Sequence, residues 1–202
     1  MPDRAPPPPQ PALPVAEARR LRRQLVHAAA WLQGVWGDEA VPPAFRWETL
    51  SGLPAWALGT RPQLERLALL TGTLFAAPAL RRCLHPGPLL RVRGLLGSDT
   101  LERVLALPDD PTLHSPEWPA DESSERDTLH AWGAALLAAS LPDPLVQASL
   151  VRALSLSPVL VQRGLPPAEL GLRMANQALE IAAAVSPPAG QSSPAPQSQE
   201  TA

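Results

Sequence analysis

The stretch LLTGTLFAAPALRRCLHPGPLLRVRGLLGSDTLERVLAL, residues 69–107, decides the fold of this chain. Its leucines recur at helical spacing, the pair Arg81–Arg82 interrupts them, and residues 97–99 (Gly-Ser-Asp) break into a fresh helix. Asp99 with Glu102 three residues later resembles a capping box at the start of that helix. The stretch holds none of the groups that an active site needs, so it predicts a helical module whose surface carries the function. Its three short helices are expected at about residues 79–84, 88–96 and 99–107.

Helical periodicity extends to both sides of this stretch. A helix is expected from about residue 15 to residue 36, and a second begins at Thr60 and is ended or kinked by Pro78. Tyr is absent and Phe occurs only twice, so the chain is poor in the residues that build strands. Further helices are expected from Ser123 or Ser124 to Leu141, from Asp143-Pro144 through Leu154, and from Pro166-Pro167 to Val185. The prediction is an all-α fold with a single compact multi-helix domain.

Proline marks both ends of the chain as tails. Residues 1–14 are half proline, which removes amide donors and favours an extended polyproline conformation. Residues 186–202 are rich in proline, serine and glutamine and show no apolar periodicity. We therefore expect a disordered Pro-rich tail at 1–14, a helical domain at 15–185 and a disordered Pro/Ser/Gln-rich tail at 186–202.

Charge and cysteine content restrict the class of protein. All 17 basic residues are Arg, against 19 acids, and the formal net charge of −2 excludes a general field for binding polyanions. The single cysteine, Cys83, is expected to be a buried structural thiol, and it fits a reducing compartment. The first residues lack the apolar segment of a signal peptide, and the uncharged runs are too short to span a membrane. We expect a soluble cytoplasmic protein.

The motifs of catalysis and cofactor binding are missing from the sequence. Cys83 and His85 stand two residues apart, but no second cysteine completes a tetrahedral metal site. No GxSxG, GxGxxG or GxxxxGK[ST] motif occurs. An enzyme that uses Cys83 or a histidine would need a concave pocket around that cysteine. We therefore expect no catalytic residue, no cofactor and no metal, and predict that the chain is not an enzyme.

A cluster of arginines leaves a second interpretation open. Arg19, Arg20, Arg22 and Arg23 crowd the first turns of the first expected helix, where they oppose the helix dipole. A run of charge of this kind is usually a solvated helix face. The alternative is a helical nucleic-acid-binding regulator in which the Arg19–Arg23 cluster contacts phosphates. The affinity of such a regulator for DNA would fall steeply with salt, which distinguishes the two interpretations.

Residues 42–107 resemble the central region of the K-type accessory proteins of bacterial type III secretion systems. That family carries a leucine-rich helix, a Leu-Arg-Arg sequence, a short turn, and a helix start of leucine, glycine, acid and leucine. Here these are Leu80-Arg81-Arg82 and Leu96-Gly97-Ser98-Asp99-Thr100-Leu101. The upstream PPAFRWETLSGLPA, residues 42–55, is similar to the family's Pro/Trp-rich segment. The Pro-rich tails depart from the family's pattern, and the C-terminal half resembles the family only in general character, without matching motifs.

The resemblance implies an all-α, non-enzymatic adaptor with two protein partners. Members of the family join the cytoplasmic domain of the inner-membrane ring protein to the pod protein of the sorting platform. The resemblance therefore implies a cytoplasmic protein that is peripheral at the cytosolic face of the inner membrane through these partners. It implies no nucleic acid and no direct membrane insertion.

Exposed charge and an isolated aromatic residue mark the candidate contact groups. One partner is expected to contact Arg81, Arg82, Arg91 and Arg93. The other is expected to contact the acidic segment between residues 108 and 127, through Asp109, Asp110, Glu117 and Trp118. The simpler interpretation is that the arginines solvate a helix face and that Trp118 closes the core.

Overall fold

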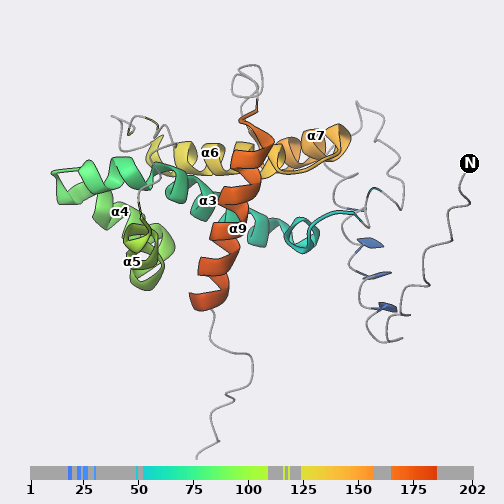
Figure 1. Ribbon diagram of the computed structural model, residues 1–202, viewed down its shortest axis with the longest axis horizontal. Coiled ribbons are helices and arrows are strands. Elements are labelled where there is room, and N and C mark those ends of the chain that lie inside the picture. Colours follow the sequence, from blue (N-terminus) through green and yellow to red (C-terminus); the bar gives the residue numbers. More distant parts are fainter. Residues whose placement is uncertain are drawn as a thin grey trace, which may run out of the picture.

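The computed structural model describes residues 52–108, 124–156 and 165–185, together with the single positions 18, 19, 22, 23, 25, 26, 30, 49, 116 and 118. Every regular element in this part of the chain is helical, and it contains no strand (Figure 1). The fold is all-α, as the scarcity of strand-forming residues predicted. Both predicted tails, 1–14 and 186–202, lie outside the described residues.

One short 3-10 helix and six α-helices have both ends within the residues that the structure describes. The 3-10 helix is η1 (Ala55–Leu58), and the α-helices are α3 (Arg61–Arg82), α4 (Pro86–Leu96), α5 (Ser98–Ala106), α6 (Glu125–Ala139), α7 (Pro144–Ala153) and α9 (Ala168–Val185). The predicted bounds of α4, α5, α6 and α9 agree with these to within two residues. Of the predicted first helix, the described positions between 18 and 30 are helical, and the remainder lies outside the described residues.

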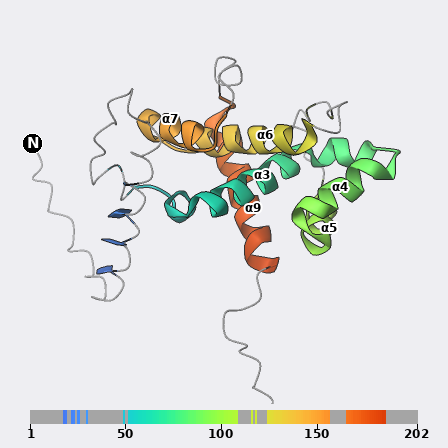
Figure 2. The same cartoon turned by 180° about the vertical axis from the view of Figure 1, so that it is seen from behind.

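α3 and α6 form the central pair of the fold and run antiparallel (Figure 1). Their register follows from two contacts: Gly72 lies against Leu129, and Gly133 lies against Ala68. α9 crosses this pair and packs against both helices, while α7 continues from the end of α6 (Figure 2). α4 and α5 lie beyond the C-terminal end of α3, at the end of the molecule where α6 begins.

Glycines allow the crossing helices to approach closely. A Cβ on Gly72 would overlap the carbonyl oxygen of Leu129, and a Cβ on Gly133 would overlap that of Ala68. Gly171 on α9 has the same relation to a backbone carbonyl of α6. Glycine inside a helix costs about 1 kcal/mol relative to alanine. These three positions tolerate that cost because only glycine lets the backbones meet.

α3 is buried around most of its circumference, because α6, α9, α4 and α5 all pack against it. The hydroxyls of Thr71 and Thr73 donate to backbone carbonyls four residues earlier, each at 2.8 Å, so these polar groups need no other partner. The helix runs through Pro78 to Arg82, so the prediction of a separate helix at 79–84 is wrong. Proline removes one backbone donor, but the apolar residues on both sides of it are buried and keep the backbone helical.

Two predicted helix starts are confirmed. Thr60 precedes α3, and its backbone N–H and hydroxyl donate to Oε1 of Gln63 at 2.8 and 3.1 Å. Asp143 precedes α7, and its carboxylate accepts from two backbone N–H groups of the first turn. The side chains of Gln63 and Asp143 thus accept from backbone N–H groups that have no partner within the helix.

The predicted capping box of Asp99 and Glu102 is wrong. α5 already begins at Ser98, and its N-cap is Gly97, which has no side chain to cap the helix. The φ of Gly97 is +87°, in a region that glycine adopts without strain. The sharp turn between α4 and α5 therefore depends on this glycine rather than on an acidic cap.

Candidate partner-binding surface

Arg81, the first arginine of the pair at the end of α3, is tied to the end of α5. Its guanidinium donates to the backbone carbonyls of Val104 and Leu105, at 3.2 and 3.0 Å, and to that of Leu107. The last carbonyls of a helix have no partner within the helix, and a cation there also interacts favourably with the helix dipole. Arg81 therefore holds the end of α5 against the end of α3.

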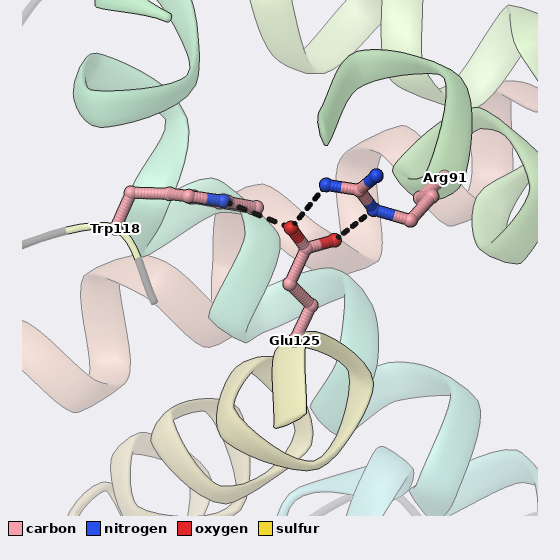
Figure 3. A network of polar contacts seen from close by, with 3 residues as sticks. All are labelled: Arg91, Trp118 and Glu125. Atoms are coloured by element: carbon pink, nitrogen blue, oxygen red, sulfur yellow. Dashed lines mark hydrogen bonds and ion pairs between the residues drawn. The ribbon is translucent and has the colours of Figure 1, made fainter. Parts of the chain in front are cut away.

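Arg91 forms a bidentate ion pair with Glu125 where α4 meets the start of α6 (Figure 3). Its Nε and one terminal nitrogen donate to the two carboxylate oxygens at 2.8 and 2.7 Å. The indole N–H of Trp118 donates to Oε1 of the same carboxylate at 3.1 Å. The side chain of Glu125 is 4% exposed and that of Arg91 is 34% exposed. A buried carboxylate that is fully paired in this way is a structural tie between elements.

Its neighbours keep Glu125 ionised. The hydrogen bonds from Arg91 lower the pKa of Glu125, and the bond from Trp118 and the charge of Arg91 lower it further, whereas burial opposes them. A carboxylate that stays charged, with both oxygens engaged, is not suited to proton transfer near neutral pH. Sequence reasoning missed Glu125, since Arg91 lies 34 positions away and no helical spacing links the two.

Arg82 and Arg93 differ from the other two arginines because they lie at the surface. Arg82 donates through Nε to the carbonyl of Pro78 at 3.0 Å, and Arg93 donates through Nε to the hydroxyl of Ser98 at 2.7 Å. Both bonds are exposed and local. The structure thus places two of the four candidate arginines, Arg81 and Arg91, in internal ties and two at the surface.

The outer face of α4 is defined here as Pro86, Leu90, Arg93, Gly94 and Gly97, which recur at helical spacing and are all exposed. Leu90 is 61% exposed, and a Cβ on either glycine would meet no atom within 4 Å. The opposite side of the helix packs inward through Leu89, Val92 and Leu96. The outer face thus presents a large apolar side chain and a cation on an open, smooth surface.

The predicted acidic contact surface lies mostly outside the described residues. Asp109, Asp110 and Glu117 belong to the part of the chain that the structure does not describe. Trp118 is half-buried, packs against the core and donates to Glu125. The simpler interpretation, in which Trp118 closes the core, agrees with these contacts.

The arginine cluster of the first helix is described in part. Arg19, Arg22 and Arg23 are exposed and helical, and Arg20 is not described. Leu25 beside them is buried in the core. This pattern agrees with a solvated helix face that has an apolar side, and it leaves the nucleic-acid alternative as a prediction.

Cys83 lies at the C-cap of α3, where its backbone N–H donates to the carbonyl of Leu80 at 3.1 Å. Its side chain is half-buried rather than buried, so the prediction of a buried structural thiol is wrong in this respect. This follows from its position at the end of the helix, outside the α3–α6 contact. Within the described residues, no three His, Cys, Asp or Glu side chains gather as a metal site would require.

Two grooves flank α3. One has a volume of about 640 Å³, lies between η1, α3 and the C-terminal half of α9, and is mainly apolar, with Trp56, Leu58 and Val185 in its wall. The other, the charged groove, has a volume of about 670 Å³ and lies between α3 and α6. Neither is lined by Cys83. Sequence reasoning found neither groove, because both are formed by residues far apart in the chain.

Comparisons with known proteins add no relative to these observations. No protein-family model, no curated protein and no solved structure matches this chain. Among the helices that the structure describes, none has the length and apolar character that a membrane crossing requires.

Proposed function

We propose that this chain is a non-enzymatic adaptor of a bacterial type III secretion system. It links the cytoplasmic domain of the inner-membrane ring protein to the pod protein of the sorting platform, and it supports protein secretion in this way. It acts in the cytoplasm, held at the cytosolic face of the inner membrane by these partners. An adaptor needs a stiff body and exposed contact surfaces rather than a reaction centre.

The outer face of α4 is the observation that carries this proposal. Leu90 on this face is 61% exposed, and Leu84 in the preceding turn is 99% exposed. Arg82 and Arg93 lie at the same end of the molecule with exposed guanidinium bonds. Arginine is enriched in protein interfaces, and exposed apolar groups beside it are typical of a contact surface. A partner helix with leucines and carboxylates on one side complements such a face.

Two internal ties support the role of α4 as a rigid contact element. Arg81 holds α5 to the end of α3, and Arg91 holds α4 to α6 through Glu125. A contact surface on a fixed helix loses less conformational freedom on binding than one on a loop. The Leu80-Arg81-Arg82 and Leu96–Leu101 sequences, which carry the family resemblance, both belong to this tied end of the fold.

Binding of the two partner proteins to substituted chains tests the proposal. The face variant combines Leu84→Ser, Leu90→Ser and Arg93→Gln. The control variant combines Leu145→Ser, Leu172→Ser and Arg103→Gln, which remove two exposed leucines, at 50% and 51%, and one exposed arginine elsewhere on the surface. We expect the face variant to lose co-purification with one partner and the control variant to retain both.

Two results would contradict the proposal. One is a face variant that melts like the unsubstituted chain and still binds both the ring domain and the pod protein. The other is tight binding to duplex DNA that falls steeply with salt and is lost when Arg19, Arg22 and Arg23 are changed to Gln. The second result would support the nucleic-acid alternative.

A further inference from the structure

The charged groove has two helical walls. α3 contributes Arg61, Glu65, Arg66 and Leu69, and α6 contributes Arg126, Asp127 and His130. The end of α4 and the residues after α7 complete the lining. Its volume of about 670 Å³ is far larger than a single inorganic anion needs and falls within the range of about 300–1,000 Å³ that is usual for ligand pockets.

The cations in this groove are incompletely paired. Arg61 is bound to Glu65, with Nε and Oε1 2.8 Å apart. The guanidinium groups of Arg66 and Arg126 form no hydrogen bond and no ion pair with any residue that the structure describes. They project from different helices, so the groove has a positive group on each wall. Three arginines therefore line the groove against two carboxylates, of which one is already bound.

Apart from Ser155, the rest of the lining is apolar. Leu69 of α3 and Leu156 after α7 are half-buried, and Leu95 of α4 is 36% exposed. A ligand that matches this lining carries negative charge for the two walls and an apolar group for the leucines. A hydrated inorganic anion leaves the leucines uncovered, and a purely apolar segment leaves the arginines without a partner.

We infer that the charged groove binds an acidic peptide segment, with carboxylates at Arg66 and Arg126 and an apolar side chain on the leucines. This inference rests on the proposed function, since it takes the segment to belong to one of the adaptor's protein partners. The groove is a second contact surface, separate from the outer face of α4.

The pKa of His130 can report whether a ligand is bound in the charged groove. Burial lowers the pKa of His130; the charges of Glu65 and Asp127 raise it, and those of Arg126 and Arg61 lower it further. Arg66 lines the same groove. A carboxylate bound in the groove adds negative charge and therefore raises the pKa of His130. His85, which is exposed at the N-cap of α4, is outside the groove and is the reference.

Fluorescence anisotropy with a defined peptide tests the inference. The probe is Gly-Glu-Leu-Glu-Glu-Leu-Glu-Gly with an N-terminal fluorescein, and the control probe has Gln in place of every Glu. We expect the full chain to bind the acidic probe saturably and the Arg66→Gln/Arg126→Gln variant to bind it about tenfold or more weakly. Arg103→Gln, which removes an exposed arginine of α5, is expected to leave binding unchanged.

Three results would overturn the inference. They are no saturable binding of the acidic probe, equal binding by the double variant, and equal binding of the Gln probe. A proton NMR titration adds an independent criterion, because saturating probe must raise the pKa of His130 and leave the resonances of His85 unshifted. An unmoved His130 in a protein that binds the probe would place the peptide elsewhere.

These outcomes are distinguishable from a failure of the proposed function. A chain that bridges the ring domain and the pod protein but does not bind the acidic probe refutes the groove alone. A chain that binds the probe through Arg66 and Arg126 but bridges nothing refutes the adaptor alone.

Discussion

Arg91 and Glu125 are joined by two parallel N–H···O bonds, at 2.8 and 2.7 Å, although 34 positions separate them in the chain. The pair fixes α4 to the start of α6, and the indole N–H of Trp118 donates a further hydrogen bond to the carboxylate of Glu125. The ion pair of Arg91 and Glu125 therefore positions the outer face of α4 relative to the central helix pair, α3 and α6.

Replacing Glu125 by Gln should destabilise the fold by about 2 kcal/mol, because hydrogen bonds to charged groups contribute about 1.5–3 kcal/mol and the partner Arg91 is partly solvated. Urea denaturation of the variant measures this. Glu65→Gln removes an exposed carboxylate paired with Arg61 and should cost less than about 1 kcal/mol. Equal losses of stability in Glu125→Gln and Glu65→Gln would show that the buried ion pair of Glu125 contributes no more to stability than the exposed pair of Glu65.

Replacing Gly72 or Gly133 by Ala should destabilise the fold by about 3 kcal/mol or more, because the new methyl group meets a backbone carbonyl that cannot move aside. Gly94→Ala is the matched control, since nothing lies within 4 Å of its added Cβ. That control should stabilise α4 by up to about 1 kcal/mol through helix propensity. Thermal melts of the three variants give the comparison, and a Gly72→Ala protein as stable as Gly94→Ala would refute the close crossing.

The ion pair of Glu125 makes stability depend on acid pH. The folded-state pKa of Glu125 lies below its ordinary value of 4.5, so its contribution is present above pH 4.5 and is lost as pH falls through the folded value. Urea denaturation across this acid range gives the free energy of unfolding at each pH. The difference in this free energy between the unsubstituted chain and Glu125→Gln should shrink toward low pH. A difference that does not change with pH would contradict the assignment.

His130 is a base rather than an acid, but it also makes the fold less stable as pH falls. Its folded-state pKa lies below the ordinary value of 6.5, so the unfolded chain takes up protons first as pH falls below 6.5. Stability should decrease from that pH down to the folded value and then level off. His130→Gln should flatten this part of the profile, and an unchanged profile in the variant would show that His130 is not responsible for it.

The sequence predicted those features that depend on residues close together in the chain. The all-α class, the starts of α3 at Thr60 and of α7 at Asp143, and the bounds of α6 follow from helical periodicity and capping. Each of these depends on residues within one or two turns of each other. Such patterns are visible in the sequence without any knowledge of the tertiary contacts.

Features that depend on packing were missed. Pro78 lies inside a helix because burial on both sides outweighs the lost hydrogen bond, and α5 starts at Ser98 because the chain turns sharply at Gly97. Nothing in the sequence distinguishes the four candidate arginines, Arg81, Arg82, Arg91 and Arg93, from one another. The fold separates them: Arg81 and Arg91 contact groups 24 and 34 positions away, whereas the contacts of Arg82 and Arg93 are local.

The most direct test of the adaptor proposal is a three-component binding measurement. The pod protein is immobilised, the cytoplasmic domain of the ring protein is in solution, and the amount retained is measured as this chain is added. The proposal predicts that retention of the ring domain requires the chain, rises with its concentration and is lost with Leu84→Ser/Leu90→Ser/Arg93→Gln. Retention that is independent of the chain, or none at any concentration of the folded protein, would contradict it.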